Sequence, residues 1–189
     1  MTLRLWSAAI AILAAPFAAH AAEAGGRGAA LLSPVPSACI SSPFGPRVLP
    51  NRPMAGTFHN GVDMPAPAGE AVRAAAAGMV MRIQRKGPGG LEVLVQHDGF
   101  VAIYSHLGMV TPALAEGKTR LAAGDKIGVV GHSGLTYGMH VYFEMLEAGR
   151  PVDPAPYLGV PLCHGAIRTQ GDMLASDGKI PPTRHYAGR

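Results

Sequence analysis

The sequence predicts an all-β fold in a single domain. Two observations carry this prediction. Between residues 39 and 162, Gly and Pro recur about every eight to twelve residues, a spacing typical of short strands joined by turns. The stretches between them are short and either apolar or alternating, as strands of a β-sheet domain require.

The predicted strands follow from these stretches. We expect strands over residues 72–83, 91–97, 101–107, 126–130 and 139–146. The segment 92–96 alternates poorly but is β-branched and apolar, which predicts a strand buried on both faces. Residues 114–121 fit either a helical turn or an elaborated loop.

The N-terminus has the pattern of a secretory signal peptide. Arg4 precedes an uncharged run, and Ala19, His20 and Ala21 form a small-x-small cleavage site. A membrane anchor over residues 5–22 is the alternative, but Pro16 and His20 interrupt it. We therefore expect cleavage after residue 21, no stable membrane insertion, and a secreted or periplasmic protein associated with the cell envelope.

Composition divides the remaining chain. Residues 22–38 are rich in Gly, Ala, Ser and Pro and predict a flexible lead-in, residues 39–163 form the domain, and residues 164–189 predict an extended or disordered tail. The net charge of +4 is mild and comes without a Lys/Arg cluster, so it favours an anionic cell-wall polymer over nucleic acid.

Two cysteines, Cys39 and Cys163, lie near the two ends of the patterned region. In an oxidising compartment they suit a structural disulfide, and closing so long a loop stabilises the fold by about 4 to 5 kcal/mol in the entropic model. A catalytic thiol is the alternative, but neither Cys lies in a nucleophile motif.

Five side chains in patterned segments have the chemistry of a site. His59 and Asp63 are four residues apart, so they share a side of a strand or of a helix, and imidazole with carboxylate suits zinc. His106 ends an alternating strand. His140 and Tyr142 are two apart on a predicted strand and therefore share a face.

Seven motifs in order resemble the lysostaphin/LytM-type zinc metallopeptidases over about residues 39–160. They are SPFGPR (42–47), HNGVDMPAPAG (59–69), AAAAGMV (74–80), YSHL (104–107), GDKIGVVGHSG (124–134), GMHVYFE (138–144) and GRPVDPAPYL (149–158). The resemblance implies an antiparallel β-sheet domain with a groove for peptidoglycan peptides. It assigns His59 and Asp63 as zinc ligands, and His106 and His140 as the groups that handle protons or stabilise the oxyanion.

The chain departs from the family at the third zinc ligand, where Tyr142 replaces a histidine. A catalytic zinc uses three protein ligands and an exchangeable water, and a neutral phenol is a poor donor. Tyr142 or His140 could complete the set and make the protein a zinc endopeptidase. Alternatively, the protein resembles degenerate members that bind peptidoglycan and activate cell-wall amidases. A purely structural wall-binding module is a third class.

Other polar residues receive lesser roles. Asn60 and Tyr104 are expected to shape the substrate groove, and Glu144 to orient a neighbour as an acceptor. His97 and His132 lie at predicted turns, where structural roles are sufficient.

Overall fold

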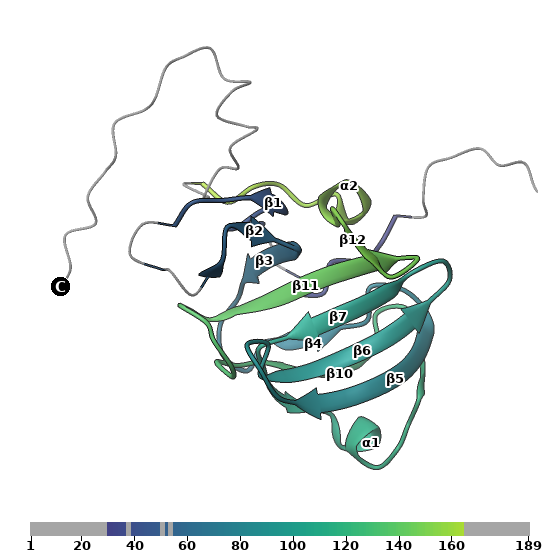
Figure 1. The fold of residues 1–189 in the computed structure, drawn as a ribbon. Helices are drawn as coiled ribbons and strands as arrows, with labels where there is room; N and C mark the ends of the chain where they lie inside the picture. The colour runs from purple at the N-terminus through teal and green to yellow at the C-terminus, as the bar shows by residue number, and fades with distance from the viewer. Residues whose placement is uncertain (1–29, 37–38, 50–51, 53–54, 165–189) are drawn as a thin grey trace, which may run out of the picture.

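The computed structural model describes residues 30–36, 39–49, 52 and 55–164. These residues form antiparallel β-sheets with two short helices, so the predicted all-β fold is confirmed (Figure 1). In the large sheet the strand order is β12-β11-β7-β6-β5-β9, and β3 also pairs with β11. Its strands are β12 (Arg150–Val152), β11 (His140–Glu147), β7 (Val101–Ser105), β6 (Leu91–His97), β5 (Gly78–Arg85), β9 (Arg120–Leu121) and β3 (Gly61–Pro65).

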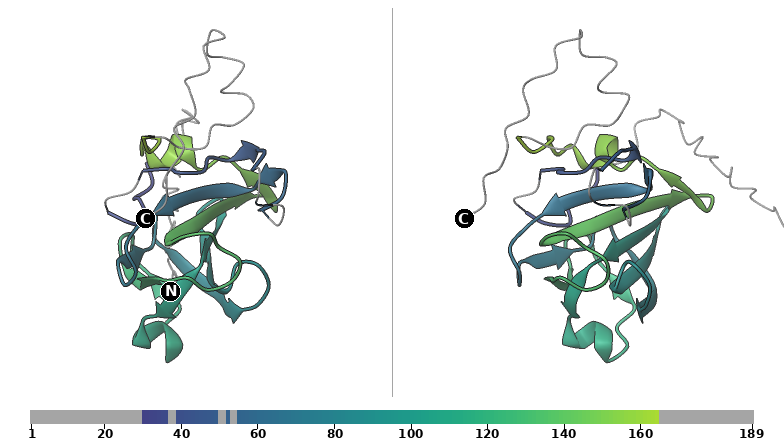
Figure 2. Two further views of the ribbon diagram at one scale, coloured as in Figure 1. Left: turned by 90° about the vertical axis from the view of Figure 1, so that its left-hand side faces the viewer. Right: turned by 60° about the vertical axis from the view of Figure 1, so that its left-hand side comes forward.

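Two smaller sheets accompany the large one. A three-stranded sheet has the order β4-β10-β8, and a two-stranded ribbon pairs β1 with β2. Helices α1 and α2 lie at opposite ends of the domain, with α2 near the β1–β2 ribbon (Figures 1 and 2). The bounds are β4 (Ala71–Arg73), β10 (Lys126–Val130), β8 (Leu107–Val110), β1 (Gly45–Pro46), β2 (Phe58–His59), α1 (Pro112–Ala115) and α2 (Ala155–Leu158).

The predicted strands at 91–97 and 126–130 match β6 and β10, while two longer runs are divided. The run 72–83 splits into β4 and β5, which belong to different sheets. The run 101–107 breaks at His106, whose φ of 63° is incompatible with an extended strand. Within 114–121, the chain forms the end of α1 and then β9.

The core lies on one face of the large sheet. Along β6, Val93 and Val95 are fully buried while Glu92 and Leu94 are half-buried, so the prediction of a strand buried on both faces was wrong. Tyr104 of β7 and Phe143 of β11 join the same cluster, with ring centroids 5.1 Å apart. The opposite faces of β6, β7 and β11 therefore remain available for polar side chains.

Both ends of the described chain pack onto the domain. Leu31 and Val35 belong to the core, and the amide of Leu31 donates to the carbonyl of Tyr157 at 2.9 Å. Residues 30–36 thus depart from the flexible lead-in expected for 22–38, because buried apolar side chains and backbone hydrogen bonds hold them on the domain. The disulfide between Cys39 and Cys163 is present, as predicted.

The signal peptide and almost all of the predicted tail lie outside the described residues. Across the part of the chain that the structure describes, no helix is long and apolar enough to cross a membrane.

Candidate metal centre

One face of β11 forms the floor of the candidate site. His140, Tyr142 and Glu144 alternate along the strand with buried core residues. The register pairs Tyr142 with Asp63 of β3 and Glu144 with Gly61. A Cβ at Gly61 would lie 2.4 Å from the carbonyl oxygen of Phe143, so glycine is required for β3 to approach this closely.

Three imidazoles around this floor are held in the same way, each by its Nδ1 against a backbone carbonyl. The acceptors are Pro43 for His59 at 3.0 Å, Ser133 for His106 at 2.8 Å, and Gly138 for His140 at 3.0 Å. Because a carbonyl can only accept, each Nδ1 carries the hydrogen. In the neutral rings, each Nε2 is therefore a lone-pair donor to a metal or an acceptor of a proton.

Two of these lone pairs converge on one carboxylate oxygen. Nε2 of His59 and Nε2 of His140 each lie 3.3 Å from Oδ1 of Asp63. Three acceptor atoms cannot hydrogen-bond to one another, so this cluster requires a cation, either protons on the rings or a metal ion. His59 and Asp63, which the sequence assigned to one metal, thus lie together, and His140 joins them.

The pKa of Asp63 reflects these neighbours. Burial raises this pKa, but the hydrogen bonds and the charge of the His140 and His59 rings lower it by more. The net pKa of Asp63 is therefore below the usual range of an aspartate. Nη1 of Arg47 lies 3.8 Å from Oδ2 and adds a positive charge on the other side of the carboxylate. Asp63 is therefore ionised at neutral pH and available as a ligand.

His106 occupies a strained position between β7 and β8. Its φ of 63° is unusual for a non-glycine residue, and such strain persists only where the surroundings enforce it. Its amide donates to the carbonyl of Gly89 at 2.9 Å, and its ring lies 4.8 Å from that of His140, centroid to centroid. Burial lowers the pKa of His106, although the carbonyl of Ser133 partly offsets this. The ring is therefore neutral at pH 7 and able to accept a proton.

The hydroxyl of Tyr142 is engaged in a hydrogen bond along its own strand. The hydroxyl donates to Oε2 of Glu144 at 2.8 Å, which gives Glu144 the acceptor role expected of it. Burial, and then the charge of and hydrogen bond to Glu144, raise the pKa of Tyr142 well above its usual value. The phenol therefore stays protonated, which makes it a poor metal donor.

His59, Asp63 and His140 are residue types that zinc binds, but their spacing in the structure fits zinc only in part. Two ligands of a tetrahedral zinc, each 2.0–2.1 Å from the metal, are about 3.3 to 3.4 Å apart, and the two imidazole-to-carboxylate separations match this. Yet no group of three or more His, Cys, Asp or Glu side chains within the described residues is gathered closely enough to hold a metal ion as it stands. The residue types therefore fit zinc, but the described structure does not gather all three side chains around one point.

A cavity of about 670 Å³ opens over this cluster. One wall comes from the loop 135–139 that precedes β11, and another from Ser41, Ser42, Arg47, Leu49, Arg52 and Ala55. Leu135, Tyr137 and Met139 expose apolar surface there, and the guanidinium of Arg52 lies 4.8 Å from the centre of the Tyr137 ring.

Two residues expected in the groove lie elsewhere. Tyr104 is fully buried, and its hydroxyl accepts from the amide of Ala75 at 2.9 Å and contacts Nε2 of His97 at 3.3 Å. On β7 it faces the core, while Ser105 faces the polar side. Asn60 is exposed and lies outside the cavity wall. His97 is structural, as expected, and His132 is exposed.

The sequence did not single out two residues that support the site. Arg47 and Ser42 both line the cavity, and Nη1 of Arg47 donates to Oγ of Ser42 at 2.9 Å. Both belong to the SPFGPR motif, which was noted only as part of the resemblance. A charged residue in an otherwise apolar, turn-rich motif was the available signal.

An antiparallel sheet domain with a histidine and carboxylate cluster under a cavity defines the class as metallopeptidase-like. The model of Peptidase family M23 matches residues 57–154, which is just over half of the chain. The protein therefore belongs to peptidase family M23, in agreement with the lysostaphin/LytM-type motifs.

Individual relatives agree with this family. The chain is 40% identical over 118 residues to the DD-carboxypeptidase/endopeptidase Mpg of Neisseria meningitidis serogroup B, covering 61% of this chain and 26% of that protein. The chain thus spans about a quarter of the length of this relative.

Two solved structures share the fold. A zinc-containing peptidase from Vibrio cholerae is 27% identical with a TM-score of 0.55, over 70% of this chain and 40% of that one. The catalytic domain of the antimicrobial peptidase lysostaphin from Staphylococcus simulans is 26% identical with a TM-score of 0.54, over 62% and 89%.

Proposed function

We propose that the protein is a zinc-dependent endopeptidase of peptidoglycan in which His59, Asp63 and His140 hold the metal. The convergence of two Nε2 lone pairs on Oδ1 of Asp63 carries this proposal, because only a cation reconciles the three atoms. In this proposal His140 takes the place of the family's third ligand, and Tyr142 stays hydrogen-bonded to Glu144. The membership in family M23 supports the substrate class.

In this proposal, bound zinc supplies Lewis-acid polarisation of the scissile carbonyl and of the attacking water. Asp63 and the carbonyl-anchored rings of His59 and His140 keep the donor atoms aimed at one point. Nε2 of the neutral His106 accepts the proton that the water releases. The same nitrogen then delivers that proton to the amine as the carbon–nitrogen bond breaks.

The predicted signal peptide and the disulfide support a cell-envelope location, where peptidoglycan is accessible. The cavity, with its apolar rim, supports an extended peptide as the ligand.

The hydrogen bond between Tyr142 and Glu144 favours a second candidate. It commits the family's third ligand position to a structural contact, and within the described residues His59, Asp63 and His140 are not gathered closely enough to hold a metal ion. The protein would then bind wall peptides without cutting them and activate a cell-wall amidase.

Zinc content separates the two candidates. We would measure bound zinc and digestion of purified peptidoglycan by residues 22–189, beside the variants His140→Ala and Tyr142→His. His132→Ala is the matched control, since His132 is an exposed histidine outside the cavity wall. The endopeptidase proposal predicts one zinc per chain and active digestion, with zinc affinity reduced more than about 100-fold in His140→Ala and unchanged in His132→Ala.

Zinc bound only by Tyr142→His would overturn the endopeptidase proposal, since the loss of the family ligand would then have disabled the site. An increase in amidase activity on mixing would support the second candidate in that case.

A further inference from the structure

The disulfide closes a strap that pairs with Asp63 and lines part of the cavity over the candidate metal centre. The terminal strap, residues 39–43 and 160–163, is joined by Cys39 and Cys163, whose Cα atoms are 4.9 Å apart. Within it, the amide of Ile40 donates to the carbonyl of Pro161, and the amide of Cys163 donates to the carbonyl of Ile40, both at 2.8 Å. The segment that ends the described chain thus holds the segment that begins the domain.

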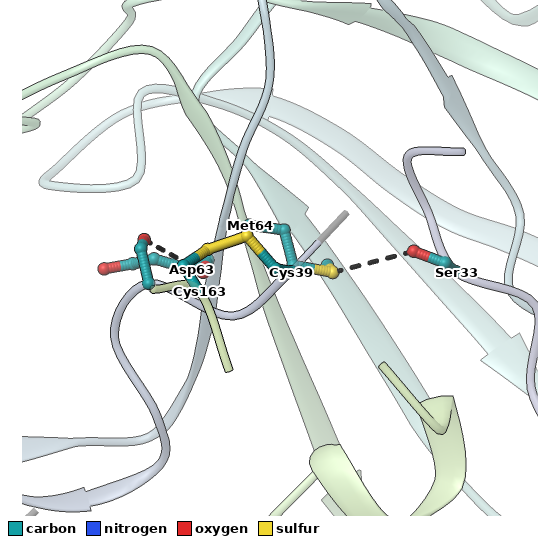
Figure 3. Close-up of a disulfide and its surroundings, with 6 residues drawn as sticks. Ser33, Cys39, Asp63, Met64 and Cys163 are labelled. Atoms are coloured by element: carbon teal, nitrogen blue, oxygen red, sulfur yellow. Dashed lines mark hydrogen bonds between the residues drawn. A yellow bond between two sulfur atoms is a disulfide. The ribbon is translucent and has the colours of Figure 1, made fainter. Parts of the chain in front are cut away.

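The strap in turn holds the backbone of Asp63. The amide of Asp63 donates to the carbonyl of Ser42, and its carbonyl accepts from the amide of Ser41, both at 2.9 Å. The hydroxyl of Ser41 also donates to that carbonyl at 3.2 Å. Figure 3 shows the disulfide beside Asp63 and Met64 of β3. Both main-chain polar groups of this candidate ligand therefore depend on the strap.

The strap also aims His59. The carbonyl of Pro43 accepts the Nδ1–H of His59, which leaves Nε2 directed at Asp63. Oγ of Ser42 lies 3.4 Å from the same Nδ1 and accepts a hydrogen bond from Arg47. Two of the three proposed zinc ligands are thus oriented by five consecutive residues that the disulfide fixes at one end.

We infer that the Cys39–Cys163 disulfide is a positioning element of the metal centre, so that its reduction loosens His59 and Asp63 and weakens metal binding. Cys163 is half-buried and lines the cavity, which leaves the bond open to small thiols. A dithiol supplies both electrons: one thiolate attacks a protein sulfur, the second resolves the mixed disulfide, and two protein thiols and one oxidised dithiol result. The consequence for catalysis rests on the proposed function, whereas the positioning itself does not.

Amide hydrogen exchange of the metal-free protein tests the positioning directly. The oxidised protein is compared with the Cys39→Ser/Cys163→Ser double variant, in which no thiol can bind metal. We expect exchange at the amides of Ser41 and Asp63 to accelerate at least about tenfold more than at Val93 and Val95 of β6, which lie far from the strap in the sheet order. Equal acceleration at all four amides would mean a global loss of stability and would overturn the inference.

Zinc affinity is the second measurement. Loss of an outer-shell support weakens metal binding about 10- to 100-fold, and we expect a decrease in this range for the double variant. Unchanged affinity would overturn the inference. If the unmodified protein binds no zinc, the proposed function fails while the exchange experiment still decides the positioning.

Should the double variant fail to fold, dithiothreitol is added to the folded wild-type protein. Exchange at Ser41 and Asp63 is then followed before unfolding develops at Val93. Selective acceleration supports the inference, and simultaneous acceleration contradicts it.

Discussion

His97 and His140 differ in the partners of their two ring nitrogens. His97, at the end of β6, has both ring nitrogens in contact with partners, the carbonyl of Ala77 at 2.9 Å and the hydroxyl of Tyr104 at 3.3 Å. His140 has Nδ1 anchored in the same way, but its Nε2 lies 3.3 Å from Oδ1 of Asp63, where a proton or a metal ion is needed between the two atoms. An imidazole with both nitrogens hydrogen-bonded stabilises the fold. An imidazole anchored through one nitrogen only can use the other to bind a metal ion or a proton.

The Tyr104→Phe substitution tests the structural role of His97 in this comparison. The change removes the hydroxyl that accepts the amide hydrogen of Ala75 and leaves His97 Nε2 without its partner. We expect the free energy of unfolding to fall by about 1 to 3 kcal/mol, the usual cost of an unsatisfied buried polar group, in denaturant titrations. Zinc affinity should stay the same. A loss of zinc with intact stability would place Tyr104 at the groove after all.

The pH dependence of stability sharpens the comparison further. Burial lowers the pKa of His97 from its ordinary 6.5, so below pH 6.5 the unfolded chain binds a proton that the folded chain resists. Stability is therefore fully present above pH 6.5 and is lost as the pH falls toward the folded pKa.

The measurement compares melting temperatures at pH 7.5 and 5.5 for the wild type and His97→Asn, both free of metal. We expect the wild type to lose about 2 to 4 °C more than the variant over this range. Equal losses would mean that His97 titrates normally in the folded protein.

The smallest effect is expected at Tyr142→Phe. If His140 is the third ligand, removing a hydroxyl that only donates to Glu144 should change zinc affinity less than about threefold. Competition with a chromogenic chelator would measure this, with His140→Ala as the opposite control. A large loss of affinity would make Tyr142 the ligand and leave His140 to handle protons.

Much of this contrast could be predicted from the sequence, but not all of it. The pair His59 and Asp63 follows from their spacing, and it lies together in the structure because Asn60 alone separates β2 from β3. Tyr104 was expected in the groove, two residues before His106. The positive φ of His106 breaks the strand between them, so their side chains do not share a face.

The strap shows a different limit. Its residues are few, rich in Ser and Pro, and carry no periodic pattern, so nothing in them predicts contact with Asp63. Its position depends on pairing between residues more than twenty positions apart and on a covalent link between the two ends.

The sequence by itself determined the family, the all-β fold and the side chains proposed for the candidate centre, because turn residues, strand alternation and metal-ligand spacing are local properties of the chain. Only the tertiary structure decided which of them meet. The direction of the Tyr142 hydroxyl toward Glu144, and of His140 toward Asp63, depends on how β3 and β11 pair. Hydrogen bonds across strands aim each side chain, and no local pattern records their partners.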